Sequence, residues 1–310
     1  MHIALIVNPT AGRRRGLRAA DAAERVLAAG GWRVTRKLTG AHGDALDLAR
    51  EAAAEGFEAV FACGGDGTLS EVVQGLIGTG AIGGLIPTGT GNDFARTVGL
   101  SQNPALAAKQ ALGGYAAEID LLEVNEGAAW SLNVMGVGFD AQVAERINRR
   151  PRLAGGVTAY LTAVAQELVR CRPTEVRVTV GKAAWEGRAL LVAVANATCY
   201  GAGMRIAPEA DIMDGLLDVV LVEHLGRLAF VRAFPRVFKG THLTHPAVHT
   251  WRASECTVET AEPAPVLIDG DVHLRTPLRV RVAHRKARFW MPGAMAPAVT
   301  PLRLEPSPEV

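Results

Sequence analysis

The sequence lacks the features of several specialised protein classes. Its four cysteines lie far apart and form no Cys-x-x-Cys pair, which argues against a disulfide framework or a zinc knuckle and favours reduced thiols. No apolar run approaches the roughly 20 residues that a transmembrane helix needs. The start, Met1–Val7, has no basic segment before its apolar run, so we expect a strand there rather than a signal peptide.

An excess of charge of one sign is also absent. Lys and Arg number 33 against 31 Asp and Glu, for a formal net charge of +2, which is too weak to indicate nucleic acid as a partner. Hydrophobic residues make up 49% of the 310 residues, enough for the cores of two domains. We therefore expect a cytoplasmic protein that contacts a membrane only from its surface.

Two common phosphate-binding motifs are missing. No Gly-x-x-x-x-Gly-Lys-Ser/Thr occurs, which excludes a Walker-type loop. The first strand ends in Asn8-Pro9-Thr10-Ala11-Gly12 instead of Gly-x-Gly-x-x-Gly, and the second ends at Thr39 instead of an acidic residue. Both differences argue against a dinucleotide-dependent hydride-transfer enzyme.

What the sequence does have is a glycine turn after a buried strand. Residues 64–68 read Gly-Gly-Asp-Gly-Thr and follow the apolar run 59–63. Glycines allow positive φ angles and a close approach to a ligand. Thr68-Leu69-Ser70-Glu71 has the pattern of a capping box, and a helix N-terminus suits phosphate. These residues predict a nucleotide-phosphate site, with Asp66 able to hold a metal ion or polarise a hydroxyl.

A second glycine turn follows the next strand. Pro87-Thr88-Gly89-Thr90-Gly91-Asn92-Asp93 lies between the apolar run 82–86 and a helix expected from about residue 93. Two such turns at neighbouring strand ends are stronger evidence of a phosphate site than either turn alone.

The order of expected elements predicts an α/β region followed by a β-rich region. Strands are expected at 3–7, 32–38, 59–63 and 82–86, with helices at 17–29, 44–55 and 69–77 between and after them. This alternation is typical of a mostly parallel sheet with both faces covered. After residue 119, period-two strands at 175–180, 189–195 and 216–222 predict a mainly antiparallel domain, with helices near 141–147 and 158–169 and a loose tail after 292.

Three polar segments have two interpretations each. Asp269-Gly270-Asp271 is either a plain hairpin turn or the site of a general base. The turn 211–218 carries three acids, which either bind a hard cation or face solvent. Arg13-Arg14-Arg15 is either a solvated cluster or a contact for phosphate or an anionic surface.

Several of these motifs together resemble one family. Asn8-Pro9, the turn 64–68, Pro87-x-Gly89-Thr90-x-Asn92-Asp93, Asp214-Gly215-Leu216-Leu217-Asp218 and Asp269-Gly270-Asp271 follow one another as in the diacylglycerol kinase catalytic-domain family. The chain resembles the bacterial soluble lipid kinases of that family, which are related to sphingosine and ceramide kinases, over nearly its whole length. It departs from the family at Asp271, where Glu is usual, and at Met213, where an acid is frequent.

The resemblance implies a fold and a reaction. It implies an ATP-binding α/β domain over residues 1–120, of the NAD kinase and diacylglycerol kinase type, to which a segment at about 281–292 returns. It implies a β-rich, mainly antiparallel lipid-substrate domain over 121–280, with ATP in the cleft and the acyl chain among apolar residues between the domains. The reaction would transfer the ATP γ-phosphate to a lipid hydroxyl in phospholipid metabolism.

The resemblance also assigns roles to residues of this chain. Asp66 would lie near a catalytic Mg²⁺, and Asp269 or Asp271 would accept the hydroxyl proton. A structural Mg²⁺ would be held by Asp211, Asp214 and Leu216. Contacts to ATP are implied for Asn8, Thr39, Gly64, Gly65, Asp66, Gly67, Thr68, Leu69, Ser70, Gly89, Thr90 and Asn92.

The expected partner is a lipid at the inner face of the membrane, contacted peripherally through Arg13–Arg15 or Arg149-Arg150-x-Arg152. The sequence favours no oligomeric state, and a homodimer is one alternative. Two rival functions stay open. A cytosolic NAD kinase shares the Gly-Gly-Asp-Gly-Thr turn, although the turn 87–93 favours the lipid branch, and a non-catalytic nucleotide-binding, membrane-associated protein would keep the same fold.

Overall fold

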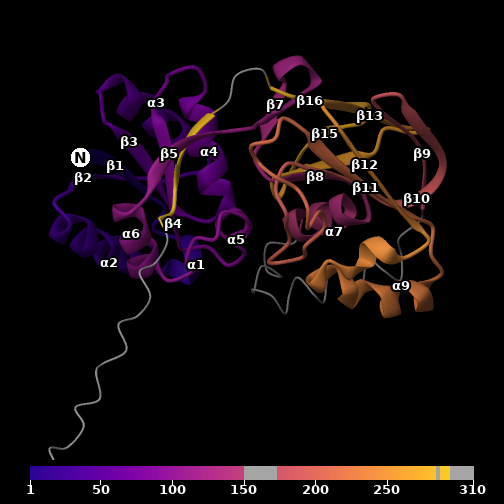
Figure 1. Ribbon diagram of the computed structural model, residues 1–310, viewed down its shortest axis with the longest axis horizontal. Coiled ribbons are helices and arrows are strands. Elements are labelled where there is room, and N and C mark those ends of the chain that lie inside the picture. Colours follow the sequence, from indigo (N-terminus) through magenta and orange to yellow (C-terminus); the bar gives the residue numbers. More distant parts are fainter. Residues whose placement is uncertain (150–172, 284–286, 294–310) are drawn as a thin grey trace, which may run out of the picture.

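The computed structural model describes residues 1–149, 173–283 and 287–293, which form two sheets with their helices (Figure 1). The predicted helix at 158–169, Cys171 and the arginines at 150 and 152 lie outside these residues, as does the tail from residue 294. Among the described residues, no helix combines the length and apolar character needed to cross a bilayer. Cys63, Cys199 and Cys256 are buried free thiols.

The first sheet has six strands in the order β2-β1-β3-β4-β17-β5. Neighbouring strands are parallel except β17 and β5, which agrees with the predicted mostly parallel sheet. The strands are β1 (His2–Val7), β2 (Arg33–Leu38), β3 (Ala59–Gly64), β4 (Ile82–Pro87), β5 (Tyr115–Ile119) and β17 (Ala287–Met291).

Helices cover both faces of this sheet. Helices α3 and α4 pack together on one face, and α2 and α6 pack together on the other (Figure 1). Buried alanines such as Ala20, Ala23, Ala49 and Ala52 allow the helices to lie close to the strands. The helices are α1 (Ala11–Arg14), α2 (Gly16–Ala29), α3 (Asp44–Ala54), α4 (Asp66–Leu76), α5 (Asp93–Thr97) and α6 (Pro104–Leu112).

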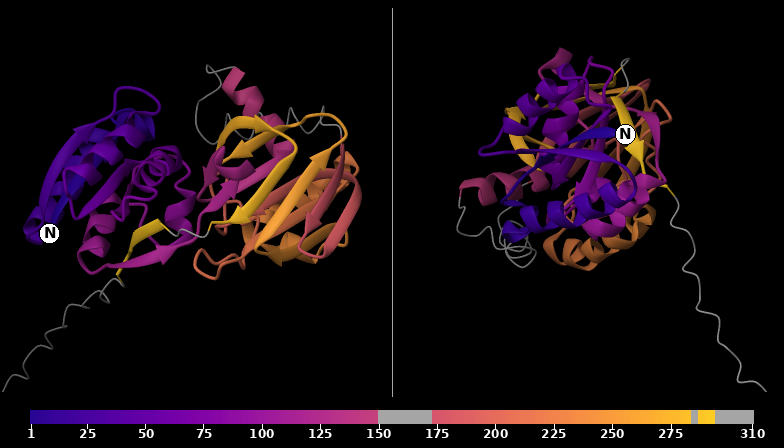
Figure 2. Two further views of the ribbon diagram at one scale, coloured as in Figure 1. Left: turned by 90° about the horizontal axis from the view of Figure 1, so that it is seen from above. Right: turned by 90° about the vertical axis from the view of Figure 1, so that its left-hand side faces the viewer.

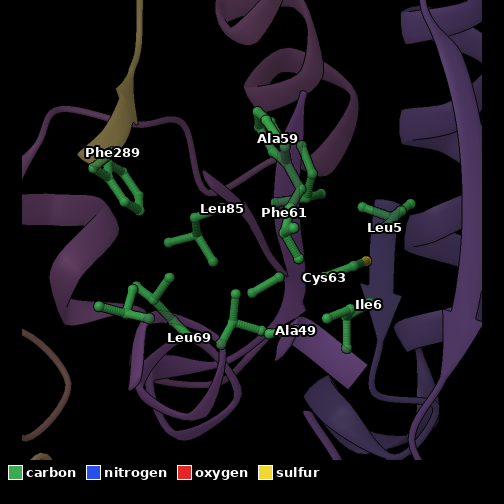
Figure 3. Packing of buried hydrophobic residues seen from close by; sticks show 14 of the residues in the cluster. Leu5, Ile6, Ala49, Ala59, Phe61, Cys63, Leu69, Leu85 and Phe289 are labelled. Atoms are coloured by element: carbon green, nitrogen blue, oxygen red, sulfur yellow. The ribbon is translucent and has the colours of Figure 1, made fainter. Parts of the chain in front are cut away.

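The core of this part consists of aliphatic residues around a few aromatic rings. Phe61 of β3 lies between Leu5 of β1 and Leu85 of β4, and all three are buried (Figure 3). The ring of Phe94 in α5 packs edge-on against Phe289 of β17, with centroids 5.0 Å apart. This contact fixes the late strand β17 to the helix that follows the second glycine turn.

The second sheet is formed by eleven antiparallel strands. Strand β9 shows the expected alternation, with Val176, Val178 and Val180 buried and the residues between them exposed. The strands are β6 (Leu122–Val124), β7 (Ala129–Ser131), β8 (Val134–Gly138), β9 (Thr174–Val180), β10 (Ala183–Ala195), β11 (Leu217–Glu223), β12 (Val248–Ala253), β13 (Glu255–Thr260), β14 (Pro265–Ile268), β15 (Asp271–Arg275) and β16 (Leu278–Val282).

Helical segments lie beside this second sheet. Helix α7 follows β8, and α9 with the short turns η3 and η4 lies between β11 and β12 in the chain (Figure 1). The predicted helix at 141–147 is part of α7. The segments are η1 (Asn125–Gly127), α7 (Phe139–Arg149), α9 (Arg227–Ala233), η3 (Phe234–Lys239) and η4 (Thr241–Thr244).

The chain passes between the two sheets twice. Asp120 and Leu121 connect β5 to β6, and residues 283–286 connect β16 to β17. Figure 2 shows β17 beside β5, away from the other late strands. Within the predicted returning segment 281–292, residues 281–282 belong to β16 of the second sheet, so the strand of the first sheet is limited to 287–291.

Candidate active site

The ends of three parallel strands meet where the strand order changes direction. Strand β1 lies between β2 and β3, and ligands of open α/β sheets bind at such a point. The backbone N–H of Asn8 donates to the carbonyl of Cys63 at 3.0 Å, and its Nδ2 donates to Thr68 Oγ1 at 3.2 Å. The Thr88 N–H donates to the Gly64 carbonyl at 2.8 Å. These bonds bring three predicted motifs together.

The two glycine turns pack backbone against backbone. A Cβ atom on Gly89 would lie 2.5 Å from Gly65 Cα, so a side chain at Gly89 would force the turns apart. The segment after β1 packs just as closely, because a Cβ on Gly12, where φ is +58°, would lie 2.0 Å from the Thr88 carbonyl oxygen. Close packing therefore explains Gly12 and Gly89 before any ligand is considered.

Helix α4 begins earlier than predicted and without a capping box. Its N-cap is Gly65, and no side chain caps the helix. Glu71 instead accepts hydrogen bonds from the N–H groups of Gly43 at 3.1 Å and Ala45 at 3.2 Å. The predicted Thr68–Glu71 box is wrong because Thr68 already lies inside the first turn. The N–H groups of that turn have no intrahelical acceptor and remain available to a ligand.

Two hollows open on either side of Gly89. The first has a volume of about 430 Å³ and contains six of the residues predicted to contact ATP, together with one of the two late aspartates. Residues missed by the sequence reasoning, among them Thr10, His42 and Glu71, also line it. Its predicted members are Asn8, Thr39, Gly65, Gly67, Thr68, Gly89 and Asp271.

The second hollow has a volume of about 410 Å³ and contains Thr90 and Asn92. Arg13 and Arg15 line it as exposed cations, and Gln102 contributes a side chain that was not predicted. Together the hollows have the size and polar lining expected for a small-molecule site. Thr10 and His42 could have been found from one signal, because each follows a strand at the same edge of the sheet. Glu71 lies inside α4 and Gln102 follows α5, so this signal would not have found them.

Some predicted contact residues line neither hollow. Leu69 is fully buried in the core, and Ser70 is almost as buried. Gly64 lies under the Thr68 side chain. Asp66 accepts a hydrogen bond from the Phe94 N–H at 3.0 Å on Oδ1. The structure therefore places eight of the twelve residues predicted to contact ATP along the two hollows.

Asp269 and Asp271 occupy different environments on one hairpin. Asp269 and Gly270 connect β14 to β15 with φ angles of +48° and +104°, as a type I′ turn requires. The hairpin interpretation is therefore confirmed. The turn also delivers Asp271 to the first hollow, and a general base in this segment stays a prediction.

The carboxylate of Asp269 has four hydrogen-bond donors. Oδ1 accepts from Ser131 Oγ at 2.7 Å and from the Asn133 N–H at 2.9 Å. Oδ2 accepts from the Leu132 N–H at 2.8 Å and from Ser70 Oγ at 3.1 Å. Part of the residue reaches solvent, but its carboxyl group is enclosed, and that burial raises its pKa against the effect of the four donors. Asp269 thus links α4 to the β-rich part.

Asp93 makes a second link between the two parts. Its carboxylate accepts from the N–H groups of Ala202 at 2.9 Å and Gly203 at 2.7 Å. Burial raises the pKa of Asp93, and the nearby charge of Asp66 adds to the effect. A Cβ on Gly91 would lie 3.2 Å from Oδ2 of both Asp66 and Asp93. The concentration of negative charge beside Gly91 suits a divalent cation at Asp66.

The predicted structural metal turn is held by other contacts. Asp214 Oδ1 accepts from the Leu216 N–H at 2.9 Å, and its Oδ2 pairs with Arg252. Asp211 accepts from the Met213 N–H at 3.0 Å. Over residues 1–149, 173–283 and 287–293, no cluster of three or more His, Cys, Asp or Glu has the geometry of a metal site. A Mg²⁺ ion at Asp211, Asp214 and Leu216 stays a prediction, and it would have to displace Arg252.

An apolar cavity lies inside the β-rich part. The acyl chain was expected elsewhere, between the two parts. The volume of the cavity is about 70 Å³, and Phe139, Leu191, Phe230 and Phe234 are among its walls. Asp140 is the buried acid of this cavity, and its burial raises its pKa to about 7. Asp140 was not predicted, although its position at the junction of β8 and α7 is one where functional acids can occur.

Known proteins match both parts of the chain. A family profile described as "Diacylglycerol kinase catalytic domain" matches residues 2–124, and one described as "YegS C-terminal NAD kinase beta sandwich-like domain" matches residues 133–293. A diacylglycerol kinase of Mycobacterium tuberculosis is 35% identical over 90% of this chain and 91% of its own. One from Bacillus subtilis is 28% identical over 86% and 88% of the two chains.

A crystal structure of a diacylglycerol kinase from Bacillus anthracis has the same overall fold. It superposes with a TM-score of 0.74 at 25% identity and covers 94% of this chain and 97% of its own. The profiles and relatives together span both sheets.

Proposed function

The chain belongs to the diacylglycerol kinase catalytic-domain family, and we propose that it transfers the γ-phosphate of ATP to a hydroxyl group of a diacylglycerol-like lipid. Its relatives are named as diacylglycerol and lipid kinases, so the chain is a lipid kinase, and membership of a kinase family implies use of ATP. The acceptor lipid and the residue roles below are our proposal.

One observation carries the proposal. The first turn of α4 and the backbone of Gly89 border the same hollow as Asp271. N–H groups at a helix N-terminus bind phosphate oxygens, and a carboxylate within the same space accepts a proton. A phosphate donor and a hydroxyl acceptor therefore fit side by side in this hollow.

We assign phosphate binding to the backbone of Gly65–Thr68 and Gly89, with the Thr68 hydroxyl beside them. Mg²⁺ at Asp66, whose Oδ2 lies near Asp93, would neutralise charge on the phosphates. Arg13 and Arg15 add positive charge on the side of the second hollow. Phosphoryl transfer depends mainly on such positioning and charge neutralisation.

We assign the general base to Asp271. Its carboxylate would take the proton of the lipid hydroxyl as the hydroxyl oxygen bonds to the γ-phosphorus and the bond to the ADP oxygen breaks. Asp269 is the weaker candidate, because four donors already occupy its two oxygens. Its role is to position the hairpin that carries Asp271.

A labelled-phosphate assay tests the proposal. Purified protein is incubated with Mg²⁺ and ATP labelled at the γ-phosphate, and separately with diacylglycerol, sphingosine, phosphatidylglycerol and NAD. We expect label on a lipid acceptor and none on NAD. Label on NAD alone would favour the NAD kinase alternative, and no labelled product with any acceptor would favour a non-catalytic nucleotide-binding protein.

A further inference from the structure

Helix α9 and η3 have apolar side chains on two sides. Phe230, Phe234 and Val237, spaced as on one helix face, line the apolar cavity, and the Phe230 ring lies 5.2 Å from that of Phe139. In contrast, Leu228 is 64%, Val231 51% and Phe238 43% exposed. The inner residues explain how the segment is held. Of the outer residues, Phe238 packs edge-on against Phe234, with ring centroids 5.9 Å apart, and Leu228 and Val231 are the more exposed.

The same segment is basic and free of acids. Residues 224–254 contain no Asp or Glu, although the chain has 31 acids in total. Arg227, Arg232 and Lys239 are exposed and make no ion pair within the described ranges of the chain. Arg236 differs, because it donates to the Thr241 carbonyl at 2.9 Å and to Thr244 Oγ1 at 2.6 Å, which holds η3 against η4.

We propose that this segment is the membrane-docking surface of the protein and that its partner is an anionic lipid bilayer. We call it the α9–η3 surface; it consists of the residues Arg227, Leu228, Val231, Arg232, Phe238 and Lys239. The inference rests on the proposed function, because a kinase acting on a lipid must reach a substrate held in a bilayer.

Two physical terms favour this partner over water. The free energy falls when exposed Leu, Val and Phe side chains leave water and enter the boundary between headgroups and acyl chains. Exposed Arg and Lys side chains are attracted to a negatively charged leaflet. Figure 1 shows α9 on the outer side of the β-rich part, opposite β13 and β16.

The position of the surface relates it to the substrate. The inner residues of the same segment close the apolar cavity, which also contains Phe139 and Val143 of α7. A bilayer held against α9 would therefore lie one helix away from an apolar space inside the protein. This arrangement would shorten the path of an acyl chain out of the membrane.

Vesicle flotation tests the proposal directly. The full chain is mixed with phosphatidylcholine vesicles with and without phosphatidylglycerol. We expect wild type to bind only the anionic vesicles and to be released by added salt. The variants Leu228→Glu/Val231→Glu and Arg227→Gln/Arg232→Gln should each bind about tenfold more weakly or worse.

Matched substitutions elsewhere serve as controls. Tyr115→Glu changes a side chain of the first sheet that is 57% exposed. Arg25→Gln/Arg50→Gln removes two exposed cations from the helices α2 and α3, which cover that sheet. Both should bind vesicles as wild type does. The proposal is wrong if wild type ignores anionic vesicles, or if the α9–η3 variants bind as well as the controls.

A second assay separates this proposal from the proposed function. Each variant is given short-chain diacylglycerol dispersed in detergent, which requires no membrane docking. We expect the α9–η3 variants to phosphorylate it at the wild-type rate. If wild type is inactive on every acceptor while vesicle binding still depends on α9, the proposed function fails and the docking surface stands.

Discussion

The carboxylates of Asp269 and Asp271, which are separated by one glycine, lie in different environments. Asp269 has its carboxylate oxygens occupied by donors from Ser70, Ser131, Leu132 and Asn133. Asp271 lines the hollow that the glycine turns border. The sequence could predict that both belong to one site, but it could not divide their roles, because the donors to Asp269 come from segments far away in the chain.

We predict that Asp269→Asn destabilises the protein and that Asp271→Asn does not. An amide cannot accept at both oxygen positions, so two buried donors would lose their acceptor, at a cost of about 2–5 kcal/mol in the free energy of unfolding. Urea denaturation of the two variants measures this cost. Equal stability of Asp269→Asn and wild type would contradict the assigned positioning role.

Asp140 gives a prediction that depends on pH. Its pKa in the folded protein is raised from 3.8 to about 7, so the native state binds more protons than the unfolded state between these values. Stability from this group is therefore present at low pH and is lost as the pH rises through about 7.

The variant Asp140→Asn removes this titration. Relative to wild type, its free energy of unfolding should increase from pH 5 to pH 8 by about 3 kcal/mol, because the two pH units between 5 and the folded pKa of about 7 contribute about 1.4 kcal/mol each. Other titrating groups cancel in the difference between the two proteins. A difference that stays constant over this range would show that the carboxyl group is not buried as described.

At the scale of elements, the sequence predicted strands β1 to β4 and helices α2 to α5 to within a few residues, whereas it did not predict β5 and α6. Apolar runs such as Ile3–Val7 and Ala59–Cys63 are buried on both faces, which makes their pattern unambiguous. The start of α4 was wrong because a local capping pattern competed with the geometry of the turn, in which Gly65 is the N-cap. Strand β17 could be placed only through the family resemblance, since its partners β4 and β5 lie far back in the chain.

The packing of the glycine turns predicts unequal effects of three alanine substitutions. Gly89→Ala places a methyl group 2.5 Å from Gly65 Cα and should cost about 1–3 kcal/mol of stability. Gly67→Ala meets nothing within 4 Å, so the fold should keep its stability while ATP affinity falls. Gly113→Ala, whose nearest neighbour is 3.9 Å away, is the control and should change neither.

Thermal unfolding and calorimetric titration with ATP measure the two effects separately. Unchanged ATP affinity in Gly67→Ala would remove the first turn of α4 from the proposed phosphate site. Wild-type stability in Gly89→Ala would mean that the two turns can separate without cost.

At the scale of the whole molecule, the carboxylates of two aspartates connect the two parts of the protein through hydrogen bonds. Asp269 connects the β14–β15 hairpin to Ser70 of α4, and Asp93 connects α5 to the loop at Ala202 and Gly203. The division into residues 1–120 with 281–292 and residues 121–280 stays a proposal. No pattern in the sequence indicated these links, because both acids belong to motifs that are typical of ligand binding.

Hydrogen exchange tests the Asp93 link. In wild type the amides of Ala202 and Gly203 should exchange slowly because each donates to the Asp93 carboxylate. In Asp93→Ala they should exchange much faster, while amides of the central strand β10, such as Ala193, keep their protection. Equal exchange at residues 202–203 in both proteins would rule out the link.

We infer that this lipid kinase uses Asp271 as the base within a hollow built by the glycine turns. The most direct measurement is the rate of γ-phosphate transfer from ATP to diacylglycerol by wild type, Asp271→Asn and Asp271→Glu. We predict that Asp271→Asn lowers kcat by about 10²- to 10⁴-fold, with wild-type stability, and that Asp271→Glu retains most of the activity. Near-normal turnover in Asp271→Asn would show that Asp271 is not the general base.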